Sequence, residues 1–448
     1  MRKSTFLCAL LLLSVVTSTL NIQLHLANAE AITVPDKYLS IQEAINNARP
    51  GETIYVKAGV YFEHIVIGTN NLTIVGEDKN TTIIDGQRAG TVVHIKADNP
   101  VFSSFTIRNS GFNFTDSGIY IENSLGANLS GNNVFDSNLG IYIDASFNTV
   151  LRNNNLAANH YNFGAYADNL NGYVHDIDAS NLVDGKPLIY WVNQADKQPP
   201  TDAGYIAIVN STSITLRDLT LSKNWQAVLF AYSTNSSIKN VTGTRNMDCL
   251  WLLNCSGCAV VDSAISDNNW GGIALVDSSA CSVYKNDVTS NFGYGIFLSN
   301  ASDNLLYHNN FVNNTRQVWL FGFNSNSWDY DYPSGGNFWD NHQCADDKSG
   351  AGQNQTGSDE ICDTPFLIDS NNTDCYPLMV PWNGRSPSPS ASLILYIAIG
   401  VIIVLIASCV LYLVKTRKQP FSSLSLRLLA YRRDCSRLLQ RGQGRVSE

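Results

Sequence analysis

A pattern that returns every 22 to 23 residues is the feature of this sequence that most restricts its fold. A short segment begins with a small residue followed by an aliphatic one, as in residues 118–121, 140–143, 272–275 and 295–298. Such a unit is too short for a propeller blade, but it matches one coil of a parallel β-helix in which Asn, Gly and Ser turns join short strands. A β-sandwich would not keep a fixed period. The repeat therefore predicts an all-β parallel β-helix of about ten coils, stacked about 4.8 Å apart.

A short amphipathic segment precedes the repeats. Residues 40–48 place Ile41, Ala44, Ile45 and Ala48 on one face, and Pro50 with Gly51 ends the segment. A solenoid must cover the open end of its core. We therefore expect a short N-terminal capping helix.

Both ends of the chain carry targeting signals. Arg2 and Lys3 precede an apolar run that closes with an Ala-x-Ala site, which is typical of a secretory signal. Residues 391–414 contain no charge and are long enough to span a membrane, and basic residues follow at once. The sequence predicts a single transmembrane helix, a cell-membrane location, an extracellular body and a cytoplasmic tail.

These features divide the chain into segments. The expected segments are a signal peptide (1–29), an N-terminal cap (30–52), a parallel β-helix (53–330) with an insertion at about 172–205, a C-terminal cap with an acidic loop (331–384), a Ser/Pro stalk (385–390), the transmembrane helix (391–414) and a basic tail (415–448). Between the signal and the tail, 36 acidic residues face 18 basic ones. Such an acidic body argues against nucleic acid as a partner. Twelve Asn-x-Ser/Thr sequons in the body are consistent with an external glycoprotein.

Several local motifs resemble a known family. The start of the body, residues 41–67, resembles pectin-lyase-like right-handed β-helix proteins. Residues 184–191, 333–339 and 362–379, together with the coils, resemble the NosD-like group of carbohydrate-binding and sugar-hydrolysis (CASH) domains. The resemblance covers roughly residues 32–382 and implies a right-handed parallel β-helix. That group contains enzymes, copper-site accessory proteins and surface proteins, so the resemblance implies a fold more than an activity.

One position of the repeated strand is expected to point outward and is rich in aromatic residues. Because side chains alternate along a strand, the residue between two aliphatic ones faces away from the core. We call the aromatic residues at this position the outward strip: Tyr120, Tyr142, Tyr166, Trp251, Phe297 and Trp319. Glu122 and Asp144 are expected beside them as hydrogen-bonding groups. The outward strip suits the apolar faces of successive sugar rings, unless the 172–205 insertion or the Trp328–Trp339 segment covers it as a secondary core.

Catalysis would need acidic groups on one outer face. One turn column contains Asp262, Lys285 and His308, the weak catalytic candidates for a polysaccharide lyase or glycoside hydrolase. The alternative reading is a surface ion pair between Asp262 and Lys285. No pair of acids stands out in the sequence.

Metal binding is expected, if anywhere, in the acidic loop. Asp346, Asp347, Asp359 and Asp363 supply the oxygen ligands that calcium prefers, although a disulfide-closed loop without metal would have the same composition. The NosD resemblance implies a copper role, which favours Met, His and Cys ligands. The body contains two methionines, and its histidines are scattered without the spacing of metal ligands.

Two disulfides are expected from cysteine positions. Cys258 and Cys281 are one coil apart at the same turn position, within bridging range, although parallel free thiols or a bond to Cys255 would also fit. Cys344 and Cys362 flank the acidic loop, with Cys375 as a rival partner.

Together these patterns favour a membrane-anchored extracellular protein that binds glycan or cell-envelope polymer without catalysis. A surface polysaccharide lyase or glycoside hydrolase is the alternative, and a copper-site accessory role is the second alternative.

Overall fold

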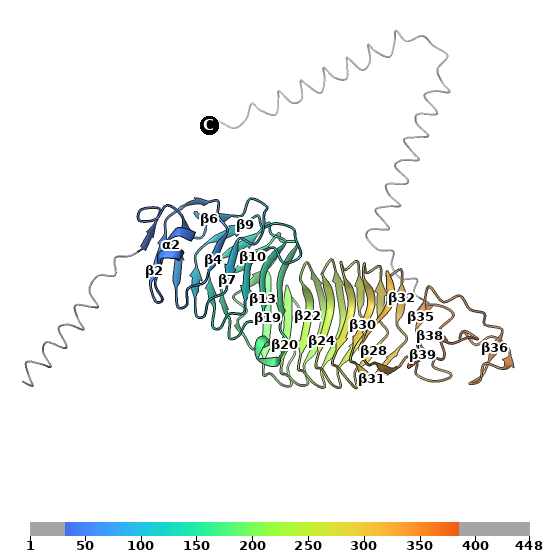
Figure 1. Ribbon diagram of the computed structural model, residues 1–448. Coiled ribbons are helices and arrows are strands. Elements are labelled where there is room, and N and C mark those ends of the chain that lie inside the picture. The colour runs from blue at the N-terminus through green and yellow to red at the C-terminus, as the bar shows by residue number, and fades with distance from the viewer. Residues whose placement is uncertain (1–31, 385–448) are drawn as a thin grey trace, which may run out of the picture. The chain divides into compact units, whose positions relative to one another are not determined.

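The computed structural model describes residues 32–384, which form a parallel β-solenoid of the right-handed type (Figure 1). One sheet runs through 13 strands, so the solenoid has about 13 turns rather than the ten expected. The N-terminal coils explain the difference. Thr53 pairs with Thr73, Thr73 with Val101 and Val101 with Asn128, which are spacings of 20, 28 and 27 residues. Because turn lengths vary there, the period is hidden in the sequence.

The first stretch of coils has three sheet faces. One seven-stranded face contains β1 (Ile32–Val34), β2 (Thr53–Val56), β5 (Thr73–Gly76), β8 (Val101–Ser103), β11 (Asn128–Ser130), β14 (Val150–Arg152) and β17 (Asp176–Ile177). A five-stranded face contains β4 (Ile65–Ile67), β7 (Val93–Ile95), β10 (Ser117–Glu122), β13 (Leu139–Asp144) and β16 (Tyr161–Tyr166). The third face contains β3 (Gly59–Tyr61), β6 (Thr82–Asp85), β9 (Thr106–Arg108), β12 (Asn133–Phe135), β15 (Asn155–Ala157) and β18 (Leu182–Val183).

The second stretch of coils continues from that third face. Its strands are β19 (Lys186–Val192), β20 (Tyr205–Val209), β22 (Gln226–Ala231), β24 (Asp248–Leu253), β27 (Gly271–Val276), β30 (Tyr294–Ser299) and β33 (Arg316–Phe321). The opposite sheet contains β21 (Thr215–Ser222), β23 (Ser237–Thr244), β25 (Ala259–Val261), β26 (Ala264–Ser266), β28 (Ser282–Tyr284), β29 (Asp287–Thr289), β31 (Ser302–Tyr307), β32 (Asn310–Val312), β34 (Ser325–Ser327) and β35 (Phe338–Trp339).

The two stretches meet between β16 and β19. A 3-10 helix, η1 (Leu170–Tyr173), follows β16, and β18 turns back on β19 as an antiparallel pair with Leu182 opposite Pro187. The five-stranded face therefore ends at β16, while the 13-stranded sheet continues past it. This interruption creates the junction at which the candidate site lies.

The N-terminal end is covered by the expected helix, α2 (Ile41–Asn47). Ser40 caps it by accepting from the backbone nitrogen of Glu43 at 3.1 Å. Ile41, Ala44 and Ile45 are buried and join the core of the first coils. The helix thus shields core residues that the first coil would otherwise expose.

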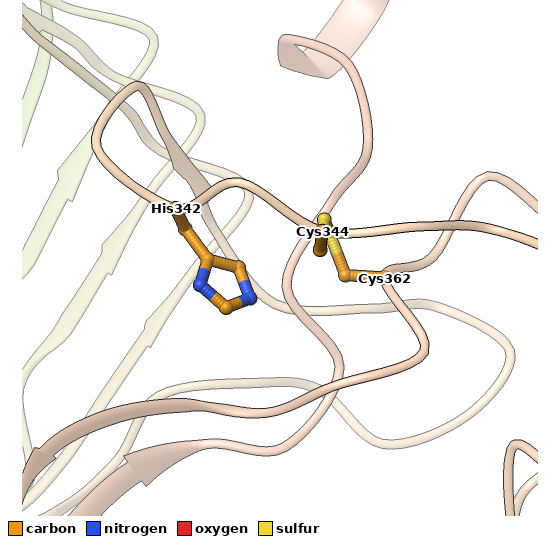
Figure 2. Close-up of side chains that lie close together, drawn as sticks. All are labelled: His342, Cys344 and Cys362. Carbon is orange, nitrogen blue, oxygen red and sulfur yellow. A yellow bond between two sulfur atoms is a disulfide. The ribbon is translucent and has the colours of Figure 1, made fainter.

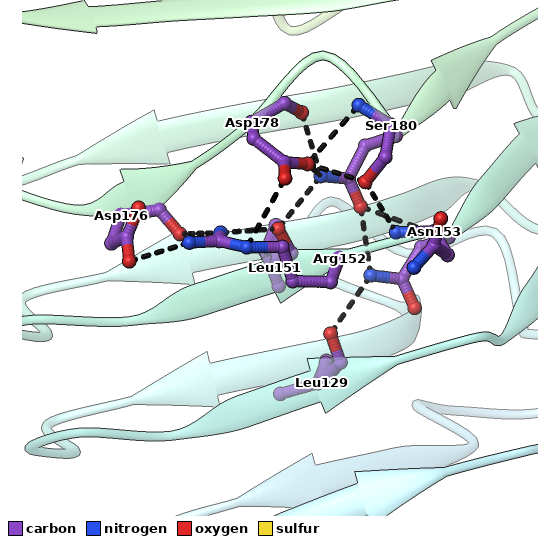
Figure 3. A network of polar contacts seen from close by, with 9 residues as sticks. Leu129, Leu151, Arg152, Asn153, Asp176, Asp178 and Ser180 are labelled. Carbon is purple, nitrogen blue, oxygen red and sulfur yellow. Dashed lines mark hydrogen bonds and ion pairs between the residues drawn. The ribbon is translucent and has the colours of Figure 1, made fainter.

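Stacked polar side chains join consecutive coils at their turns (Figure 3). The amide nitrogen of Asn154 donates to Leu129 O at 3.0 Å and to Asn181 Oδ1 at 2.9 Å. On the outside, the Arg152 guanidinium pairs with Asp176 at 2.5 Å and Asp178 at 3.2 Å. Since buried polar groups are costly without partners, these ladders both hold the turns and fix coil register.

A small C-terminal cap follows the coils. Its elements are β36 (Lys348–Ser349), β37 (Gln355–Thr356), β38 (Phe366–Asp369), β39 (Asn372–Asp374) and the 3-10 helix η2 (Trp382–Gly384). Within residues 32–384 no helix is long and apolar enough to cross a membrane. The expected signal peptide, stalk, transmembrane helix and basic tail lie outside the described residues.

Candidate functional site

A groove of about 450 Å³ opens where the two stretches of coils meet. Strand β16 lies beside the turn that leads into β22, since the nitrogen of Trp225 donates to Phe163 O at 2.9 Å. We call this space the junction groove. Its lining comprises Phe114, Thr115, Tyr142, Asp144, Tyr166, Trp225, Gln226, Met247, Asp248, Trp251 and Trp270.

The first-stretch members of the outward strip are more buried than expected. Tyr120 is 9% exposed and Tyr142 6%, and both pack in a cluster with Trp225. The ring centroids of Tyr142 and Trp225 are 5.1 Å apart. The expectation of an open platform is therefore wrong for Tyr142, which Trp225 covers, and for Tyr120, whose ring is stacked with those of His94 and Tyr142.

Tyr166 occupies a different place from the one expected. Pairing of β13 with β16 puts Gly164 opposite Tyr142 and Tyr166 opposite Asp144, so Tyr166 lies two residues further along the strand. The missing side chain at Gly164 leaves room for Trp225, which an added Cβ would strike. Tyr166 is 43% exposed and forms one wall of the groove.

The second-stretch members remain partly exposed. Trp251, Phe297 and Trp319 form a chain of rings, with centroids 6.5 Å apart for the first pair and 5.2 Å for the second. At the same strand position, Ala274 between Trp251 and Phe297 and Leu229 one coil before Trp251 are fully buried. Leu229 joins the first-stretch core together with Tyr190 of β19, so this end of the outward strip is a secondary core.

A buried acid lies in the groove lining. Asp248 is 6% exposed and accepts from the Tyr294 hydroxyl at 2.5 Å. Gly271 stands between them in register, and a side chain there would collide with the Tyr294 ring. Burial raises the pKa of Asp248 to about 7, while the hydrogen bond from Tyr294 acts in the opposite direction.

Gln226 lies beside Asp248 on the neighbouring strand. It is 3% exposed and its Nε2 donates to Ala165 O at 3.0 Å. Its Oε1 has no hydrogen-bond partner within the part of the chain that the structure describes. A buried acceptor without a partner is uncommon in native proteins.

The two acids expected beside the outward strip behave differently. Asp144 lines the groove and accepts from the Tyr120 hydroxyl at 2.7 Å. Glu122 instead contacts His94 at 2.9 Å and Lys96 at 3.2 Å, so its carboxylate is engaged on the surface of the first stretch.

Sequence reasoning missed Trp225, Trp270, Gln226, Met247 and Asp248. These residues come from two columns of the repeat that immediately precede the repeated segment. Trp225, Met247 and Trp270 share one column, and Gln226 and Asp248 share the next, as the strand pairing shows. The signal was present in the repeat, three and four positions upstream of the outward strip.

The weak catalytic candidates lie away from the junction groove, in or beside a polar cleft of about 420 Å³. Asp262 and Lys285 line this cleft, but Asp262 pairs with Lys239 at 3.7 Å, whereas Lys285 lies over the Trp382 ring. His308 is stacked under Trp382 with ring centroids 3.5 Å apart. All three candidates have positive φ, which explains this column as a left-handed turn position.

The carboxylates of the acidic loop accept hydrogen bonds from the backbone of the same loop. Asp346 accepts from the nitrogens of Asp359 and Glu360 at 3.0 and 2.9 Å, and Asp363 accepts from those of Asp347 and Lys348. Among the described residues, Asp346, Asp347, Asp359 and Asp363 do not gather three ligand atoms at one point. Calcium binding at this loop stays a prediction.

Sulfur and nitrogen atoms gather at the base of the same loop (Figure 2). The structure joins Cys344 and Cys362 in a disulfide, with their Cα atoms 5.5 Å apart, and His342 lies within 4.8 Å of their sulfurs. Met379 Sδ is 3.8 Å from Cys344 Sγ. Because the disulfide removes both thiolates, this set does not fit a copper site, and we derive no copper chemistry from it.

The bridge expected between Cys258 and Cys281 is not formed. Both are buried free thiols, as is Cys255. Cys258 donates to Ser233 O at 3.5 Å and Cys281 to Cys255 O at 3.8 Å. Each thiol thus turns toward a carbonyl of the preceding coil, so the stacked side chains lie in parallel and occupy the place of ladder residues.

Comparison with known families gives two matches, each over part of the chain. Residues 193–344 match the family described as periplasmic copper-binding protein (NosD), and residues 31–147 match the pectinesterase family. These matches confirm the resemblance to NosD-like, pectin-lyase-like β-helix proteins.

Individual relatives cover limited parts of the chain or are distant. A probable pectinesterase/pectinesterase inhibitor 6 of Arabidopsis thaliana is 35% identical over 111 residues, which is 22% of this chain and 19% of that protein. The match therefore spans about a fifth of that relative's length.

Solved structures with similar coils are more distant in sequence. The surface adhesin PfbA of Streptococcus pneumoniae is 13% identical, with 66% of this chain and 90% of that chain covered and a TM-score of 0.32. An alginate lyase of Paenibacillus is 11% identical, with 63% and 95% covered and a TM-score of 0.28.

Proposed function

We propose that this β-solenoid is a glycan-binding protein of the cell surface and that the junction groove holds the glycan. The convergence of Tyr166, Trp225, Trp251 and Trp270 on one groove with two acids carries the proposal. Aromatic faces suit the apolar faces of sugar rings, and a few fixed polar groups supply orientation. A location in the cell membrane, with the body outside the cell and a single span after it, is part of the proposal and rests on the sequence signals.

The groove also has the form of a site rather than a flat surface. Its volume falls within the range of small-molecule sites, and it combines apolar walls with the polar ends of Asp144, Gln226 and Asp248. Tyr166 and Trp270 in its lining are 43% and 44% exposed, so their rings are accessible to a ligand. A single sugar unit or short oligosaccharide would contact both stretches of coils at once.

A glycan-array screen of the full-length protein tests this function. We expect retention of a defined set of glycans, with loss of those same signals in Trp251→Ala. Phe323→Ala is the matched control, because Phe323 is 68% exposed and lies outside the groove lining. Equal retention by the wild type and Trp251→Ala would contradict the proposal.

Hydrolysis of the bound glycan is the second candidate function. One observation favours it: Asp144 and Asp248 line the same groove, and the buried Asp248 has a raised pKa while Asp144 is half-buried. Glycoside hydrolysis uses two carboxyl groups in such unequal surroundings. New reducing ends released from a retained glycan, and lost in Asp248→Asn, would identify an enzyme; intact glycan would identify a binder.

A further inference from the structure

The junction groove has an unusual charge balance. Asp144 and Asp248 are its acidic residues, and none of the side chains that line it belongs to Lys, Arg or His. The basic residues Lys223 and Arg245 line a separate neighbouring pocket instead. A ligand that carries an anionic group would therefore meet like charge, whereas a cationic group would meet opposite charge.

The walls of the groove also suit a cation. Three tryptophans, Trp225, Trp251 and Trp270, line it, and indole faces attract ammonium groups more strongly than other aromatic rings do. Trp251 is partly exposed and Trp270 is 44% exposed, so ring surface is accessible to a ligand. Aromatic side chains form the cages that bind quaternary ammonium ligands in proteins.

Asp248 lacks the cationic partner that a ligand ammonium group would supply. Among the described residues its carboxyl accepts from Tyr294 and takes part in no ion pair. A buried carboxyl without a counter-charge is costly in its ionised form. A ligand ammonium beside it would stabilise that form.

We propose that the junction groove recognises its glycan through the free ammonium group of an unacetylated amino sugar, held between tryptophan faces and the carboxylates of Asp248 and Asp144. This inference rests on the proposed glycan-binding function. It names the chemical class of the ligand, which the aromatic walls alone would not determine.

The proposal has a protonation signature. The titratable groups around Asp248 are Tyr294 on β30, Tyr161 on β16, the adjacent Cys249 and Asp144 across the groove. Burial raises the pKa of Tyr294, Tyr161 and Cys249, so they stay neutral near pH 7. Binding of a cation should therefore release a proton from Asp248 at pH 6 to 6.5, where that carboxyl is largely protonated.

The test compares two oligosaccharides of equal length on the full-length protein. A glucosamine oligosaccharide carries ammonium groups, and its fully N-acetylated counterpart carries none. Isothermal titration at pH 6.2 in two buffers of different ionisation enthalpy measures affinity and proton release together. We expect the glucosamine oligosaccharide to bind about tenfold tighter or more, with proton release.

Asp248→Asn is the matched variant, because the amide keeps the shape and hydrogen-bonding reach of the carboxyl. It should remove the proton release and most of the preference for the glucosamine oligosaccharide. Equal or weaker binding of that oligosaccharide relative to the acetylated one would overturn this inference. If other glycans are still retained through Trp251, the glycan-binding function stands; if no glycan is retained, that function fails as well.

Discussion

The hydroxyl of Tyr294 reaches Asp248 across the backbone of Gly271, which occupies the coil between them. The three residues share one register position on β24, β27 and β30, and the hydrogen bond of 2.5 Å spans 46 residues of sequence. Glycine is required there because any Cβ would meet the Tyr294 ring. The absence of a side chain at Gly271 therefore allows Tyr294 to hold the buried carboxyl of Asp248 at the wall of the groove.

Replacing Gly271 tests this arrangement. Gly271→Ala should displace the Tyr294 ring and lower the free energy of unfolding by about 1–3 kcal/mol, the usual cost of overpacking. Urea unfolding measures the change. Gly68→Ala is the control, since an added Cβ there meets nothing within 4 Å. Equal stability of the two variants would show that Tyr294 is not fixed by Gly271.

Stability should depend on pH through Asp248. Its pKa is raised from 3.8 to about 7 by burial, so the unfolded chain releases this proton at lower pH than the folded protein does. The stability that Asp248 contributes is fully present below about pH 4 and is lost as pH rises through 7. Asp248→Asn should thus become progressively more stable than the wild type between pH 4 and 7. A constant difference in Tm over that range would contradict the buried, raised carboxyl.

Buried asparagines at equivalent turn positions of consecutive coils hydrogen-bond to one another and form a ladder. We expect the loss of one of these side chains to lower the free energy of unfolding. Asn286 donates to Val260 O and to Asn309 Oδ1, and its own Oδ1 accepts from the nitrogen of Ser263. Asn286→Ala would leave several buried groups without partners, a loss of about 1–3 kcal/mol or more. Chemical unfolding against Asn133→Ala, whose side chain makes one contact of 3.5 Å, provides the comparison. Equal unfolding midpoints of the two variants would show that the ladder contributes little to stability.

Peptide mapping without reduction should find one body disulfide. The account predicts the Cys344–Cys362 bridge together with free thiols at Cys258 and Cys281. Reduction should loosen the intervening loop, because closing a loop of this size contributes about 3 kcal/mol. Faster proteolysis within residues 345–361 after reduction is the expected readout. A Cys258–Cys281 peptide would instead show that those side chains turn toward each other.

Much of the architecture could be predicted from the repeat. The 22- and 23-residue offsets correctly place Tyr120 opposite Tyr142 and Ile273 opposite Ile296. The N-terminal coils could not all be recognised from the repeat, because their turns differ in length. Tyr166 does not occupy the expected outward position, because this coil keeps an offset of 22 residues and so places Gly164 opposite Tyr142.

The groove itself could not be predicted from periodicity. It forms because Trp225 packs against Tyr142 and Gly164, residues of another sheet face that are more than 60 positions earlier. A repeat relates each residue to its neighbour one coil away, and it carries no information about contacts across an interruption. The burial of Tyr142 follows from this contact across the junction.

A crystal structure of the protein with a glycan that it retains tests the central claim most directly. The account predicts a sugar ring on the exposed face of Trp251, between Tyr166 and Trp270, with a polar group directed at Asp248. A glycan seated instead in the polar cleft of Asp262 and Lys285, with the junction groove empty, would contradict it.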